Sequence, residues 1–130
     1  MAQTTIHPDE VERFNAMADE WWDKNGKFAP LHHITPLRLE WIKQYADTPN
    51  CTLLDIGCGG GLVAEPLAQA GAKVTAIDAG EKNIKIAKLH TEKSGVEVDY
   101  RCTTAEEMTG QYDVVTALEI IEHVADIPAF

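Results

Sequence analysis

The fold of this chain of 130 residues is decided by one stretch, Leu53-Leu54-Asp55-Ile56-Gly57-Cys58-Gly59-Gly60-Gly61-Leu62. The residues from Thr52 to Leu54, together with Ile56, are apolar or favour strands, which predicts a buried parallel strand. The glycines predict a tight turn, followed by a helix over 62–70. Glycine suits such a turn because it adopts positive φ and lets a ligand approach the backbone where a Cβ would collide. The stretch therefore predicts a loop that cradles a nucleotide-like ligand.

The spacing of the glycines narrows the class of ligand. A dinucleotide-binding loop has the pattern Gly-x-Gly-x-x-Gly, and here Leu62 occupies the third glycine position. Asp55, just before the first glycine, suits a ligand with a positive charge, such as the ammonium and sulfonium of S-adenosylmethionine. The next predicted strand, 73–78, ends at Asp78, about 20 residues further on, where an acid would hydrogen-bond a ribose diol. An NAD-dependent dehydrogenase stays the alternative of a different chemical class, with Asp55 and Leu62 counting against it.

Strands continue to alternate with helices after this point. A helix is predicted over 81–93, and further strands over 96–101 and 114–118. This alternation predicts an α/β fold with a parallel, doubly wound, Rossmann-like sheet over 49–130. In such sheets ligands bind at the carboxyl ends of the strands, where Asp55 and Asp78 both fall.

Two helices are predicted ahead of the first strand, within an accessory segment over 1–48. Pro8 suits the first turn of a helix, and apolar residues recur at intervals of three and four as far as Trp22. Thr35 and Pro36 are typical of a cap and a first helical residue, which predicts a second helix from 36 to about 46. Residues 23–34 are predicted to be a loop.

Composition excludes several classes of protein. The formal net charge is −10 and the pI is about 4.8, which argues against nucleic acid as a partner because phosphate contacts need clustered Lys and Arg. The three cysteines lack metal-type spacing and are expected to be free thiols. No apolar run approaches the ~20 residues of a membrane span, and the first residues resemble no export signal. We therefore expect a cytoplasmic protein.

Several further motifs extend the pattern. They are Trp21-Trp22-Asp23, Gly26-x-Phe28-x-Pro30-Leu31-His32, Pro36-Leu37-Arg38, Ala87-Lys88-Leu89-His90 and Leu118-Glu119-x-x-Glu122-His123. The glycine loop followed by Asp78 resembles the Rossmann-like S-adenosylmethionine-dependent methyltransferases. The whole set, from about residue 9 onwards, resembles the O-methyltransferase family of ubiquinone biosynthesis. The resemblance implies transfer of a methyl group from S-adenosylmethionine to a hydroxyl of a polyprenylated catechol or demethylubiquinol.

Pattern and resemblance together give a set of cofactor-binding residues. The predicted set is Arg38, Asp55, Gly57, Gly59, Asp78 and Leu118. The resemblance implies that Arg38 binds the methionyl carboxylate, for which a guanidinium is a suitable partner. It also implies that residues 1–48 cover the cofactor and an apolar substrate. His32 is a further candidate for a catalytic role, although loop histidines also serve as simple hydrogen-bonding residues.

The stretch Glu119-Ile120-Ile121-Glu122-His123 carries the predicted acceptor chemistry. If Glu119 opens a helical turn, Glu122 and His123 lie on the same face. Two carboxylates suit Mg²⁺, and the resemblance implies that the three residues hold one. A divalent ion chelated by both catechol oxygens would lower the phenol pKa from its usual value near ~10. Without a metal, His123 would act as a general base, so His123 and Glu119 are the predicted catalytic residues.

The resemblance also sets expectations about partners and extent. A polyprenylated substrate lies in the bilayer, which implies peripheral contact with the bacterial inner membrane or the matrix side of its mitochondrial counterpart, near other ubiquinone-biosynthesis enzymes. Only four strands are predicted, whereas the resembled fold has about seven. The chain is therefore predicted to be the front part of an enzyme. A methyltransferase for another small-molecule acceptor and an inactive cofactor-binding fragment stay open as alternatives.

Overall fold

The structure is a computed structural model that describes residues 8–45, 49 and 51–118. Its elements in chain order are α1 (Pro8–Trp22), α2 (Ala29–Tyr45), β1 (Thr52–Ile56), α3 (Ala64–Gln69), β2 (Lys73–Asp78), α4 (Glu81–Ser94), β3 (Asp99–Cys102), the 3-10 helix η1 (Ala105–Glu107) and β4 (Val114–Thr116). Within the described residues, no helix is long and apolar enough to cross a membrane.

The four strands form one parallel sheet in the order β3-β2-β1-β4. Leu53 of β1 pairs with Val74 of β2 on one side and with Val114 of β4 on the other. Because β1 lies inside the sheet, its side chains have an apolar environment on both faces, and Leu53 is fully buried. The predicted α/β fold with a Rossmann-like parallel sheet is confirmed.

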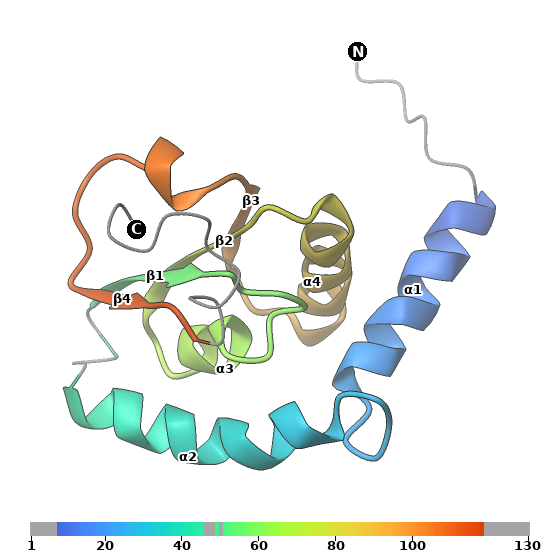
Figure 1. Ribbon diagram of the computed structural model, residues 1–130, viewed down its shortest axis with the longest axis horizontal. Coiled ribbons are helices and arrows are strands. Elements are labelled where there is room, and N and C mark those ends of the chain that lie inside the picture. Colours follow the sequence, from blue (N-terminus) through green and yellow to red (C-terminus); the bar gives the residue numbers. More distant parts are fainter. Residues whose placement is uncertain (1–7, 46–48, 50, 119–130) are drawn as a thin grey trace.

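Helix α4 packs against both the sheet and the N-terminal segment. Its residues Ile84 and Ala87 belong to the main apolar core around Leu53, while Ile86 packs with Ala18 of α1 in a smaller cluster. In Figure 1, α1 accordingly runs beside α4, and α2 extends along the side of the molecule where α3 lies. Helix α1 therefore packs on the sheet domain through α4, whereas α2 contributes Ile42 to the main core.

The predicted start of the second helix is wrong. Helix α2 begins at Ala29, seven residues before Pro36, so the predicted loop over 23–34 shrinks to 23–28. Thr35 is not a cap, because its hydroxyl donates to the carbonyl of Leu31 within the helix, at 2.6 Å. The physical reason is that Pro30 suits the first turn as well as Pro36 does, since the N–H groups of that turn have no partner within the helix.

Three other predicted boundaries shift. The strand predicted over 114–118 ends at Thr116, because its pairing with β1 extends only from Val114 to Thr116. The pairing of β3 with β2 begins only at Asp99 opposite Thr75, so residues 96–98 precede the strand that was predicted from 96. Helix α3 begins at Ala64 instead of 62, because the turn that starts at Gly57 continues through Gly61, whose φ is 92°. Helix α4 agrees with its prediction to within one residue.

Candidate functional site

The glycine loop joins β1 to α3 at the carboxyl end of the sheet. Gly57, Gly59 and Gly61 all have positive φ, at 73°, 55° and 92°. A Cβ on Gly61 would also collide with the buried hydroxyl of Tyr100, so this position needs glycine for two reasons. The backbone N–H groups of Gly57 and Cys58 both donate to the carbonyl of Ile77 in β2, at 2.8 and 3.0 Å. The loop is thereby fixed to the end of the neighbouring strand.

Asp78, at the carboxyl end of β2, holds two loops: the glycine loop and the short turn that leads into α4. One carboxylate oxygen accepts the backbone N–H of Gly59 at 3.0 Å, and the other accepts that of Gly80 at 2.7 Å. The amide of Asn83, in the first turn of α4, lies 3.4 Å from the second oxygen. Each carboxylate oxygen can accept more than one hydrogen bond, so Asp78 can hold the glycine loop and still accept from a ligand hydroxyl.

Asp55 lies deeper, inside β1. It is 3% exposed, and one of its oxygens accepts a hydrogen bond of 2.7 Å from the hydroxyl of Thr116 on β4. Burial raises the pKa of Asp55 from 3.8 to about 7, with a smaller contribution from the nearby charge of Asp78 and an opposing one from Thr116. A cation placed beside this carboxylate would favour its ionised form. The site therefore suits a positively charged ligand.

A cavity of about 320 Å³ joins these groups. Its lining includes every predicted cofactor-binding residue: Arg38, Asp55, Gly57, Gly59, Asp78 and Leu118. They come from α2, from β1 and its loop, from the end of β2 and from the segment after β4. The structure thus brings together residues that lie up to 80 positions apart in the chain. Their role in binding stays a prediction.

Sequence reasoning missed part of the lining. Leu31 and Thr35 reach the cavity from α2, and Asn83 reaches it from α4. Asn83 carried a usable signal, because it lies in the first turn of the helix that follows Asp78, at the ligand-binding edge of the sheet. Leu31 carried no such local signal, because residues 23–34 were predicted to be a loop.

The two N-terminal tryptophans both contact the glycine loop. The ring of Trp21 lines the cavity and is stacked on Phe28 with centroids 4.0 Å apart. It lies so close to Gly60 that a Cβ there would be 2.7 Å from the indole. The predicted cover therefore contacts the loop through Trp21. His32 does not line the cavity, and its Nε2 instead lies 2.8 Å from the backbone carbonyl of Trp21.

Neither the thiol of Cys58 nor a second hollow next to the sheet suits a role in ligand binding or catalysis at this site. Cys58 lines the cavity, but burial raises the pKa of its thiol far above neutral pH, so it cannot supply a thiolate nucleophile. A larger hollow of about 800 Å³ is lined by Thr52, Lys73 and Asp99, which begin three of the strands. It lies at the amino ends of the strands, opposite the edge where parallel sheets bind ligands.

The predicted metal ligands Glu119, Glu122 and His123 lie outside the described residues. Within residues 8–45, 49 and 51–118, no group of three His, Cys, Asp or Glu side chains is arranged to hold a metal ion. Leu118, the last described residue, lines the cavity, and Glu119 follows it directly in the chain.

Comparison with known families decides among the alternatives for this site. A family described as "Methyltransferase domain" matches residues 54–130, which include the glycine loop, Asp78 and Leu118. The chain belongs to this methyltransferase domain family. The match covers more than half of the chain and all the cavity-lining residues from Asp55 onwards. The family match therefore favours a methyltransferase over the NAD-dependent dehydrogenase, which the pattern of glycines alone left open as an alternative.

Several curated relatives of this methyltransferase domain carry the name ubiquinone biosynthesis O-methyltransferase. The ubiquinone biosynthesis O-methyltransferase of Ruegeria sp. (strain TM1040) is 49% identical over 95% of this chain and 56% of the relative. Those of Pseudomonas paraeruginosa and Sinorhizobium fredii are 53% and 50% identical, over 90% and 99% of this chain and 52% and 58% of the relatives. The resemblance predicted from the motifs is confirmed. The chain spans about half the length of the curated relatives it matches.

Solved structures agree with the fold of the methyltransferase domain. Magnesium protoporphyrin IX methyltransferase from Synechocystis PCC 6803, with bound S-adenosylmethionine, matches with a TM-score of 0.71 at 22% identity, over 94% of this chain and 67% of that one. The YcgJ protein from Bacillus subtilis matches with a TM-score of 0.64 at 26% identity, over 74% of this chain and 42% of that one.

Proposed function

We propose that this chain binds S-adenosylmethionine in the cavity at the carboxyl edge of the sheet. We further propose that the protein transfers its methyl group to a hydroxyl of a polyprenylated catechol in ubiquinone biosynthesis. The observation that carries the proposal is the convergence of Arg38, Asp55, Asp78 and the glycine loop on one cavity. The names of the curated relatives and the cofactor bound to the Synechocystis methyltransferase support it.

The cavity offers a suitable group for each polar part of the cofactor. Asp78, at the end of β2, would accept hydrogen bonds from the ribose hydroxyls. Asp55 would face the positively charged methionyl end, and the guanidinium of Arg38, which lines the same cavity, would pair with the methionyl carboxylate. Leu118 and Trp21 supply apolar lining for the remainder. Each of the two acids in the cavity, Asp55 of β1 and Asp78 of β2, thus has a separate proposed role.

The acceptor chemistry is proposed for the residues that follow Leu118. Glu119, Glu122 and His123 would hold a divalent cation, and their two carboxylates are ligands that Mg²⁺ prefers. When bound, such an ion would lower the pKa of the catechol hydroxyl. His123 is also the candidate general base. The link to the described structure is the position of Leu118 in the lining of the cavity, next to Glu119 in the chain.

We also propose a location at the inner face of a membrane, without a span, next to other enzymes of ubiquinone biosynthesis. The support is the chemistry of the acceptor, since a polyprenyl chain partitions into the bilayer. The formal charge of −10 supports the absence of nucleic acid among the partners.

Transfer of a labelled methyl group tests the catalytic part of the proposal. The chain is incubated with S-adenosylmethionine and a short-chain polyprenyl catechol, with Mg²⁺ or with a chelator. We expect methylated catechol that depends on Mg²⁺ and is reduced at least tenfold in Glu119→Gln, while Glu97→Gln, an acid remote from the cavity, retains activity. Methylation of soluble catechols alone would favour a different acceptor. Cofactor binding without any transfer would favour a cofactor-binding fragment.

A further inference from the structure

Trp22 contacts the glycine loop without lining the cavity. Its indole Nε1–H donates to the backbone carbonyl of Gly60 at 3.2 Å, although the two residues are 38 positions apart in the chain. Gly60 lies between two glycines with positive φ, so the chain here has wide conformational freedom. Gly60 has no side chain with which to fix itself. A hydrogen bond from another element therefore restricts the loop at its most permissive point.

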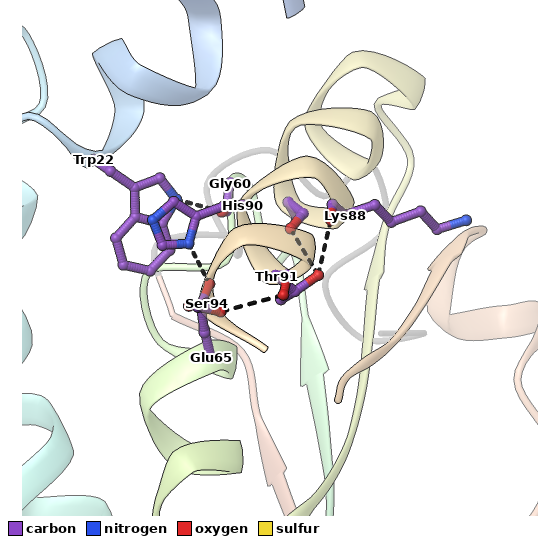
Figure 2. A network of polar contacts seen from close by, with 8 residues as sticks. Trp22, Gly60, Glu65, Lys88, His90, Thr91 and Ser94 are labelled. Atoms are coloured by element: carbon purple, nitrogen blue, oxygen red, sulfur yellow. Dashed lines mark hydrogen bonds and ion pairs between the residues drawn. The ribbon is translucent and has the colours of Figure 1, made fainter. Parts of the chain in front are cut away.

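The indole of Trp22 is itself held by a second ring. The imidazole of His90, on α4, stacks on it with centroids 3.7 Å apart and an interplanar angle of 5°. The Nδ1 of His90 lies 2.6 Å from a carboxylate oxygen of Glu65, which is only 2% exposed. Figure 2 shows the indole of Trp22 next to the imidazole of His90, with one dashed line from Trp22 to Gly60 and another from His90 to Glu65. Stacking and hydrogen bonding together fix the plane of the indole.

The chain of contacts returns to the loop through the backbone. Glu65 is the second residue of α3, and its N–H donates to the carbonyl of Gly61 at 3.1 Å. Two successive loop carbonyls thus accept hydrogen bonds from the two ends of this chain of contacts: that of Gly60 from the Trp22 side chain, and that of Gly61 from the backbone of Glu65. A buried carboxylate is costly unless it is hydrogen-bonded, so Glu65 in turn needs His90 in its present position. None of the three side chains lines the cavity.

We propose that Trp22, His90 and Glu65 are positioning residues that hold the glycine loop in its ligand-binding conformation and tie it to α1. The inference rests on the proposed function, because the ligand is taken to be S-adenosylmethionine. It gives a role to two motifs that the cavity does not use, the second tryptophan of Trp21-Trp22-Asp23 and the histidine of Ala87-Lys88-Leu89-His90. A loop fixed before the ligand arrives binds more tightly because less freedom is lost on binding.

Three variants and one spectroscopic signal test the role. Trp22→Phe keeps an aromatic ring beside His90 but removes the donor to Gly60. His90→Gln removes the stacked ring and keeps a polar side chain near Glu65. Trp41→Phe, at a position that is 62% exposed on α2, is the matched control. The signal is exchange of the indole N–H protons with solvent, followed by nuclear magnetic resonance, and the affinity probe is S-adenosylhomocysteine.

We expect the indole proton of Trp22 to exchange at least tenfold more slowly than that of free tryptophan in the same buffer, and to exchange faster in His90→Gln. Trp22→Phe should weaken S-adenosylhomocysteine binding about 2- to 10-fold, the usual effect of one net hydrogen bond, whereas Trp41→Phe should not. The double variant Trp22→Phe/His90→Gln should bind as the weaker single variant does, because both changes act through one contact.

In a chain that binds the probe, the inference would be overturned if the Trp22 indole proton exchanged as fast as that of free tryptophan, or if Trp22→Phe left the affinity unchanged. Fully additive effects of Trp22→Phe and His90→Gln would also contradict it, since the residues would then act independently. A wild-type chain that binds no S-adenosylhomocysteine would instead contradict the proposed function, and with it the part of the inference that concerns the cofactor.

Discussion

The fold strongly alters the acid–base chemistry of Asp55. Burial inside β1 raises its pKa to about 7, with Thr116 as its hydrogen-bond donor. In the unfolded chain the same carboxyl titrates near 3.8. The folded, ligand-free chain therefore keeps a proton on Asp55 over a pH range in which the unfolded chain has lost it. A ligand cation beside Asp55 would reverse this preference.

The pH dependence of stability follows from that difference. Because the folded state binds the proton more tightly, the contribution of Asp55 to stability is fully present below pH 4 and is lost as pH rises through 7, by at most about 4 kcal/mol. Asp55→Asn keeps an acceptor for Thr116 and cannot titrate. We expect urea unfolding at pH 5 and pH 8 to show a smaller loss of stability in the variant than in the wild type. Equal losses in the two proteins would contradict the assignment.

Helix α2 is the element that sequence reasoning placed least well. Thr35 and Pro36 are typical of a helix start, yet they lie about two turns into a helix that begins at Ala29. Pro36 has no N–H for the carbonyl of His32, four residues earlier, so the helix lacks one internal hydrogen bond there. The earlier start is what places Leu31 and Thr35 on the cavity beside Arg38.

This geometry predicts that Pro36→Ala stabilises the chain. The side chain is exposed, and alanine restores the missing donor, with a gain that is partly offset by the greater freedom of the unfolded chain. We expect a net gain of about 1 to 2 kcal/mol, seen as a higher Tm. Pro30→Ala is the control, since Pro30 lies in the first turn, where the N–H has no partner within the helix, and Tm should change little. A lower Tm for Pro36→Ala would mean that α2 does not continue through this position.

The sheet was predictable from the sequence because its signals are local. Leu53 and Leu54 mark a buried strand, the glycines mark the turn, and parallel strands bring Asp55 and Asp78 to the same edge. Arg38 was found only through resemblance to a family, because a single arginine on a helix has no local pattern that assigns it to a ligand. The hydrogen bond of Trp22 to Gly60 joins segments far apart in the chain, so only the packed structure could reveal it.

At the scale of the whole molecule, the described residues form a four-stranded part of a methyltransferase domain, with one cavity at the carboxyl ends of its strands. The chain spans about half the length of its curated relatives, and β4, a strand of three residues, lies at one edge of the sheet with Val115 54% exposed. We propose that this part of the domain contains a binding site for S-adenosylmethionine, whatever the acceptor and whether or not a metal ion is bound.

Calorimetric titration of the chain with S-adenosylhomocysteine tests this claim most directly, with NADH as the competing ligand. Asp78→Asn is the test variant, and Asp99→Asn, at the amino end of β3 and outside the cavity, is its matched control. We predict binding of S-adenosylhomocysteine but not of NADH, retained in Asp99→Asn and weakened at least tenfold in Asp78→Asn. A cooperatively folded chain that binds NADH in preference, or binds S-adenosylhomocysteine equally well without the Asp78 carboxylate, would contradict the account.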